Sequence, residues 1–360
     1  MSKPQSPTTP PLPKTGQQRA WWRAPASSSA LAFHIAAAAR AHEGPLLAIT
    51  RDNQGAHQLE TDLHTLLGQQ ADVPVLVFPD WETLPYDIFS PHPDIVSQRL
   101  AALHRLPALK RGIVVVPVQT LLQRLAPLRH VVGGRFGGQV GSSPDLGPEK
   151  RRLESAGYRH VPQVLDPGDF AVRGGLLDVY PMGADQPFRV ELLDDEVETI
   201  RAFDPESQRS LDKIDAVHLL PGREVPQDDA SLKRALDALR ERFDLDTRRS
   251  ALYQDLKAGL APPGIEYYLP LFFDKTATLF DYLSQHTLPL LADGALEAPD
   301  QLWTHTGERY EQRRHDLERP LLPPDALYLS PSALRERLNE GQRVEIWGEG
   351  HPQRERAAAL

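Results

Sequence analysis

The chain has 360 residues, of which 40% are hydrophobic and 25% charged, and its formal net charge is −9. This composition is typical of a globular protein with roughly two or three domains, and the negative charge argues against a protein that coats nucleic acid, which needs a basic face. The sequence contains no cysteine, which excludes disulfides, zinc–thiolate sites and thiol nucleophiles and fits a cytoplasmic protein.

Residues 1–16 are predicted to form a disordered leader. They read MSKPQSPTTPPLPKTG, and such a stretch has too few apolar residues to build a packed core. It lacks the apolar segment of a signal peptide. No apolar run in the chain approaches the roughly 20 residues that a membrane-spanning helix needs.

Residues 17–127 are predicted to form the first part of an α/β domain. Three short, β-branched runs are typical of buried strands, and they cover residues 45–50, 73–78 and 112–118. Helical patterns precede or separate them at 29–42, 53–68 and 94–106. Asp94 is interpreted as the N-cap of the last helix. Strands that alternate with helices favour a parallel sheet.

Residues 128–221 follow a different pattern and are predicted to form an inserted, β-rich domain. Its segments are short and are punctuated by glycine. A helix is expected at 149–158 with Gly157 at its C-terminal cap. Two antiparallel strands are expected at 188–193 and 196–203, joined by a tight acidic turn.

Residues 222–350 are predicted to return to the α/β domain and complete it. This segment begins with a helical pattern at 229–244, and its apolar runs at 287–293 and 343–348 are interpreted as further strands. Residues 351–360 are interpreted as a tail or a truncation point.

The stretch between the first strand and the first helix is interpreted as a degenerate phosphate loop. A nucleotide site would carry G-x-x-x-x-G-K-[ST] there, but residues 21–33 read WWRAPASSSALAF and have neither glycine nor lysine. The loop consists of Ala26, Ser27, Ser28 and Ser29, and its serines are expected to cap the helix. An ATPase also needs an acidic pair after a buried strand, whereas Asp293 is followed by Gly294. No nucleotide cofactor is predicted.

Residues 80–95, DWETLPYDIFSPHPDI, allow two interpretations. The acidic residues and the histidine could form a hard-metal or acid–base cluster, and this candidate set comprises Asp80, Glu82, Asp87, His92 and Asp94. The favoured alternative is a loop with turns at its prolines and with aromatic residues packed on the domain. The sequence has no G-x-S-x-G or H-E-x-x-H motif, so neither a metal site nor a catalytic residue is predicted.

Residues 170–183, FAVRGGLLDVYPMG, place an arginine and two glycines within a strand-like run. The glycines are interpreted as letting another backbone approach Arg173. In the strand at 188–193, alternation places Arg189 and Leu193 on one face, and both are expected in solvent if the other face packs inward. These residues have the composition of an interface anchor. The alternative, ordinary surface arginines paired with nearby acidic residues, stays open.

Seven stretches, in order along the chain, are similar to the N-terminal region of the bacterial transcription-repair coupling factors. They read DWETLPYDIFSPHPDIVSQRLAAL, VPVQTLLQRLAP, SAGYRHVPQV, RGGLLDVYPMG, LLDDEVETIRAFDPESQRS, GIEYYLPLFF and RPLLPP. The resemblance covers about residues 17–350. The same region resembles the excinuclease B subunit (UvrB) more distantly.

The resemblance implies a discontinuous, degenerate RecA-like α/β fold that has lost its ATP site, with an inserted β-rich domain that docks the excinuclease A subunit (UvrA). The family's docking positions correspond to Arg173, Arg189 and Leu193. Some relatives have an aromatic residue at the position of Leu193. The implied function is to recruit UvrA to RNA polymerase stalled at DNA lesions.

The chain also departs from these families. The damage-probing hairpin of the excinuclease B subunit is missing, because FSPHPDIVSQRL continues directly into a helix. In the coupling factors, RNA polymerase and DNA are bound by other parts, which also carry the ATP- and Mg-dependent motor. The chain is therefore expected to be a fragment without enzymatic activity of its own. The rival hypotheses are an ATP-dependent DNA helicase or translocase and a damaged-DNA-binding protein.

Overall fold

A computed structural model describes residues 9–68, 72–133 and 136–360. Its first sheet has six parallel strands in the order β1-β14-β13-β2-β4-β3. The strands are β1 (Arg19–Arg23), β2 (Pro45–Thr50), β3 (Val75–Val77), β4 (Gly112–Pro117), β13 (Leu288–Leu291) and β14 (Arg343–Trp347). Strands from both ends of the chain therefore build one sheet, which confirms the predicted discontinuous α/β fold.

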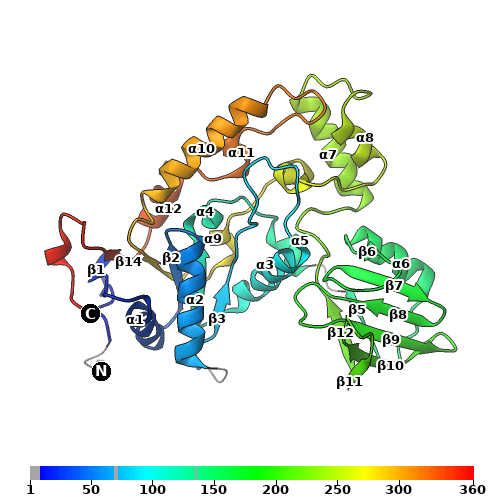
Figure 1. Cartoon of the computed structure of the whole chain (residues 1–360), viewed down its shortest axis with the longest axis horizontal. Helices are drawn as coiled ribbons and strands as arrows, with labels where there is room; N and C mark the ends of the chain where they lie inside the picture. The colour runs from blue at the N-terminus through cyan, green and yellow to red at the C-terminus, as the bar shows by residue number, and fades with distance from the viewer. Residues whose placement is uncertain (1–8, 69–71, 134–135) are drawn as a thin grey trace.

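Alternation along β2 sends its side chains into two separate cores. Leu46 and Ala48 pack with α1 (Ser28–Ala41) and α2 (Asn53–Leu67). Leu47 and Ile49 belong to the larger core on the other face, which α3 (Pro93–Arg105) and α4 (Val118–Leu121) also line. Because both faces of the sheet are covered (Figure 1), the inner strands β2 and β4 are buried along their whole length and carry no charged residue.

The helix that was predicted to begin at Asp94 begins one residue earlier. His92 is its N-cap, and His92 Nδ1 accepts a hydrogen bond from the Asp94 amide at 3.2 Å. Pro93 occupies the first turn, where its fixed φ suits a helix. Its missing N–H costs no hydrogen bond there, because the first N–H groups of a helix have no acceptor within the helix. The N-cap prediction for Asp94 was therefore wrong, and this carboxylate lies in the first turn.

A second sheet of six strands lies at the right of Figure 1, in the order β11-β10-β9-β8-β7-β6. Its strands are β6 (Arg159–His160), β7 (Asp169–Arg173), β8 (Leu176–Val179), β9 (Phe188–Leu193), β10 (Glu196–Phe203) and β11 (Ser210–Ile214). All pairs are antiparallel except β6 with β7. The β9–β10 turn has positive φ at Asp194 and Asp195, as a two-residue hairpin turn requires.

The helix α6 (Leu146–Ser155) packs on β6 and β7 at the inner face of the second sheet, and its Leu153 is fully buried. This helix starts three residues before the predicted segment, and Gly157 follows its C-cap Ala156. Beside the sheet, β5 (Phe136–Gln139) pairs with β12 (Ala216–Leu219). The remaining helices are η1 (Leu106–Ala108), α5 (Leu128–Val132), α7 (Asp229–Arg242), α8 (Ala251–Lys257), η2 (Ile265–Phe272), α9 (Leu279–Tyr282), α10 (Ala298–Arg313), α11 (Pro324–Leu327), α12 (Pro331–Asn339) and η3 (Arg354–Arg356).

Gly174 and Gly175 lie in a turn rather than within a strand. Arg173 pairs with Leu176, so the two glycines form the loop of the β7–β8 hairpin, and Gly174 has φ of +58°. Glycine suits this conformation because it has no Cβ. The strand-like run is therefore a hairpin in which the two glycines reverse the chain next to Arg173, and the interpretation that they let another backbone approach Arg173 stays a prediction.

Both ends of the described chain contact the first sheet. Residues 1–8 of the predicted leader lie outside the described residues. Residues 9–16 lie against β1, where Trp22 Nε1 donates to the carbonyl of Pro11 at 2.7 Å. At the other end, Ala358 exchanges backbone hydrogen bonds with Trp21 and Arg23, so the predicted tail pairs with β1. In the part of the chain that the structure describes, no helix has the length and apolarity needed to cross a membrane.

A buried carboxyl group in η2 should make the stability of the chain depend on pH. Glu266 accepts a hydrogen bond from Ser90 Oγ at 2.8 Å, and its burial raises the pKa of its carboxyl above the ordinary 4.5. The folded state therefore binds more protons than the unfolded state above pH 4.5, so stability should fall as pH rises through the raised pKa. Glu266→Gln should flatten this slope in urea unfolding measured from pH 4 to 8. An equally steep slope in the variant would contradict the assignment.

Candidate functional site

The outer face of the second sheet carries the three predicted docking residues. Val190 belongs to the large core, and Phe188 and Leu192 pack against it, so alternation turns the other β9 side chains outward. Asp178 of β8 pairs with Arg189, and Leu176 pairs with Glu191. Arg173 lies opposite Leu176, which places it on the same face as Arg189.

Asp178 organises the two arginines. Arg189 makes two bonds to it, from Nε to Oδ1 at 2.7 Å and from Nη2 to Oδ2 at 2.8 Å. Arg173 Nη2 donates to Oδ2 at 2.7 Å. The Asp178 side chain is only 1% exposed, so this carboxylate depends on the two guanidinium groups for its charge balance. Its hydrogen bonds raise the pKa of Arg189 above the ordinary value.

The side chains of the two arginines differ in their exposure to solvent. The Arg173 side chain is 51% exposed, whereas that of Arg189 is 14% exposed. The Arg189 guanidinium carbon also lies 4.6 Å from the centre of the Phe203 ring. Leu193, at the end of β9, is 58% exposed. The expectation that Arg189 stands free in solvent beside Leu193 was therefore wrong, because Asp178 and Phe203 hold it against the sheet.

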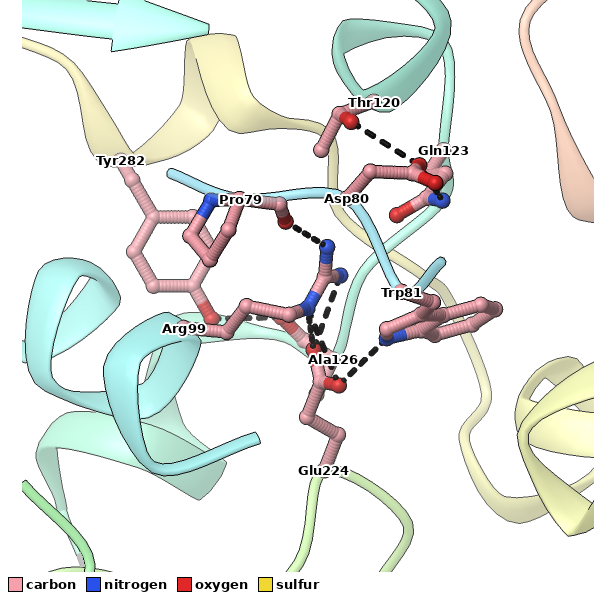
Figure 2. Close-up of polar contacts among 9 residues, drawn as sticks. All are labelled: Pro79, Asp80, Trp81, Arg99, Thr120, Gln123, Ala126, Glu224 and Tyr282. Atoms are coloured by element: carbon pink, nitrogen blue, oxygen red, sulfur yellow. Dashed lines mark hydrogen bonds and ion pairs between the residues drawn. The ribbon is translucent and has the colours of Figure 1, made fainter. Parts of the chain in front are cut away.

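A buried ion pair joins the α/β domain to the segment that leaves the second sheet (Figure 2). Arg99 of α3 donates to Glu224 through Nε and Nη2 at 3.0–3.2 Å, and to the carbonyl of Pro79 at 2.8 Å. Trp81 Nε1 donates to Glu224 Oε2 at 2.8 Å. The side chains of Arg99 and Glu224 are 0% and 3% exposed. The pair fixes this connecting segment to the α/β domain.

The acidic residues of the loop at 80–95 do not converge. Asp80 accepts hydrogen bonds from Thr120 Oγ1 at 3.0 Å and Gln123 Nε2 at 3.3 Å (Figure 2). Asp87 accepts from the neighbouring Ile88 amide, and Trp81 is buried. Within residues 9–68, 72–133 and 136–360, no three His, Asp or Glu side chains are placed to hold a metal ion. These carboxylates order the loop.

The loop at Ala26 to Ser29, interpreted from the sequence as a degenerate phosphate loop, caps a helix. Ser27 is the N-cap of α1, and its side chain accepts a hydrogen bond from the Ala30 amide at 3.2 Å. Ser29 Oγ donates to Asp62 Oδ1 at 3.2 Å, and the hydrogen bond from Ser28 lowers the pKa of Asp62. The serines are thus engaged with the helix end and with a carboxylate of α2.

Ser27→Ala should lower the free energy of unfolding by about 1 kcal/mol, because it removes an N-cap. Chemical denaturation would measure the loss. Ser155→Ala, at the exposed C-terminal end of α6, serves as the control and should cause no comparable loss. An unchanged unfolding free energy in Ser27→Ala would contradict the capping role.

Comparison with known proteins finds a family model that matches the second sheet. The family model described as the UvrB interaction domain matches residues 139–224, a range that holds β6 to β12 and all three predicted docking residues.

Over most of its length the chain is similar to several transcription-repair-coupling factors. It is 39% identical over 341 residues to that of Escherichia coli (strain K12), covering 94% of this chain and 29% of the relative. It is 42% identical over 298 residues to that of Haemophilus influenzae, covering 82% and 26%. It is 36% identical over 327 residues to that of Myxococcus xanthus, covering 87% and 27%. The chain thus spans between 26% and 29% of the length of these relatives.

Proposed function

We propose that this chain, the counterpart of the N-terminal region of the transcription-repair-coupling factors, is a docking module for the excinuclease A subunit (UvrA). The observation that carries the proposal is the coincidence of two features on one sheet. The UvrB interaction domain match covers residues 139–224, and the same sheet presents Arg173 and Leu193 on a single exposed face.

The chemistry of this face supports a docking role. Arg173 is half exposed and already oriented by Asp178, so little conformational entropy remains to be lost when a partner binds it. Leu193 offers apolar area close by. Arginine with neighbouring apolar contact is the usual composition of an interface hot spot. Arg189 contributes mainly by fixing Asp178 and by presenting its remaining guanidinium edge.

In this proposal the chain recruits UvrA to RNA polymerase stalled at a DNA lesion and performs no catalytic step itself. RNA polymerase, DNA and the ATP- and Mg-dependent motor are assigned to other parts of the longer relatives. The loop at Ala26 to Ser29 lacks the lysine and glycines that a phosphate site uses, which supports the absence of a nucleotide cofactor from this chain.

Titration calorimetry with purified UvrA tests the proposal directly. The chain is expected to bind UvrA with one-to-one stoichiometry, and heat no greater than dilution would overturn the docking role. A parallel titration with ATP is expected to give no binding. Micromolar ATP affinity would favour the helicase hypothesis instead, and salt-dependent binding of duplex DNA in the absence of UvrA binding would favour a DNA-binding protein.

A further inference from the structure

Three cations lie in direct register across the outer face of the second sheet. Arg189 of β9 is the cross-strand partner of Arg201 of β10. Arg201 is in turn the partner of Lys213 of β11. Cross-strand partners have neighbouring side chains on the same face of a sheet, so these three residues form a continuous cationic row. The row begins beside Asp178, which pairs with Arg189.

Of the three cations in the row, Arg189 alone forms an ion pair within the described chain. Asp178 binds Arg189, whereas Arg201 and Lys213 form no ion pair with the rest of the described chain. Glu191 lies on the same face, where its charge also helps to raise the pKa of Arg189, but it forms no ion pair with Arg201 or Lys213 in the described chain. Like charges directly opposite each other in a sheet destabilise it. The fold alone therefore gives no reason for Arg201 and Lys213 to stand where they do.

The row also contrasts with the chain as a whole, whose formal net charge is −9. It lies beside exposed apolar side chains. Leu211, two residues before Lys213 on the edge strand β11, is exposed, and Leu193 is exposed four residues further along β9 than Arg189. A short cationic row beside exposed leucines suits a protein surface with its own apolar and charged areas, whereas nucleic-acid backbones select longer basic patches.

We propose that Arg201 and Lys213 extend the docking face and that the row of Arg189, Arg201 and Lys213 meets an acidic patch on the protein partner. This inference rests on the proposed function, because it takes UvrA as that partner. Exposed charges at the margin of an interface act chiefly on the rate of association, whereas buried contacts set the rate of dissociation. Arg201 and Lys213 therefore steer the partner, and Arg173 holds it.

The experiment compares association kinetics of UvrA with three forms of the whole chain by biolayer interferometry. They are wild type, Arg201→Gln/Lys213→Gln, and the control Lys150→Gln/Arg151→Gln. The control removes the same charge from α6, on the opposite face of the sheet. At low salt the docking-face variant is expected to associate about tenfold more slowly with little change in dissociation. In 1 M salt, where the Debye length falls to about 3 Å, the difference should disappear.

Thermal unfolding separates docking from a structural role. Removal of two opposed like charges should leave the melting temperature of Arg201→Gln/Lys213→Gln unchanged or raise it. Association as fast as that of wild type and control would overturn the inference while leaving the proposed function intact. The inference would also be overturned if Arg201→Gln/Lys213→Gln lost UvrA binding together with a lowered melting temperature. A defect of this variant that is confined to duplex DNA binding would overturn it as well. Failure of the wild-type chain to bind UvrA would overturn the proposed function itself.

Discussion

Glu224→Gln should lower the free energy of unfolding by about 3–5 kcal/mol, because it leaves the Arg99 guanidinium buried without a counter-charge. The guanidinium is enclosed by Phe78 and Trp81, whose rings lie 4.4 and 5.0 Å from its central carbon. The Arg99 side chain is 0% exposed, so water cannot take the place of the lost carboxylate as its partner. The amide keeps the volume of the original side chain, so the effect isolates the charge.

Urea denaturation at neutral pH would measure the loss, with Glu340→Gln as the control. Glu340 pairs with Arg337 on the surface, and both side chains are at least half exposed, so this variant should unfold almost as the wild type does. A second variant, Arg99→Met/Glu224→Leu, replaces both charges with apolar side chains and should recover much of the loss. A single variant as stable as wild type would show that the pair does not hold this segment.

The sequence predicted most of the first sheet because its signals are local. The runs at 45–50 and 112–118 are almost entirely apolar and correspond to β2 and β4. The hairpin at 188–193 and 196–203 was predicted with the bounds that β9 and β10 have, since alternation and an Asp-Asp turn define both ends. The joining of strands from both ends of the chain was also expected from the return of apolar runs after residue 222.

The features that could not be predicted from the sequence depend on contacts between residues far apart in the chain. Arg99 occupies the buried face of α3 with Leu100 and Leu103, and only its partner 125 positions away explains an arginine there. Asp178 alternates with buried Leu177 and Val179 along β8, so its burial between two arginines appears only once the strands are paired. The pairing of Arg173 with Leu176 also shows that Gly174 and Gly175 form a hairpin turn, whereas in the sequence they only interrupt a strand-like run.

Arg173→Ala should weaken UvrA binding by roughly 30-fold, or about 2 kcal/mol, while leaving stability almost unchanged. Its guanidinium is half exposed, and Asp178 keeps both bonds from Arg189 when it is removed. Arg189→Ala is a less informative variant, because it leaves a buried carboxylate with a single partner and should lower stability as well as binding. Calorimetry with UvrA, accompanied by urea denaturation, measures both quantities for each variant.

Asp178→Asn tests whether the buried carboxylate positions Arg173 for the partner. If it does, the variant weakens UvrA binding although Asp178 is too buried to touch the partner, and Arg173→Ala costs less in the Asp178→Asn background than in wild type. A double-mutant cycle measures this coupling, which for residues in one network is expected to exceed about 0.5 kcal/mol. Additive effects on affinity would mean that Arg173 binds independently of Asp178. The carboxylate would then serve only the stability of the sheet, through its bonds to Arg189.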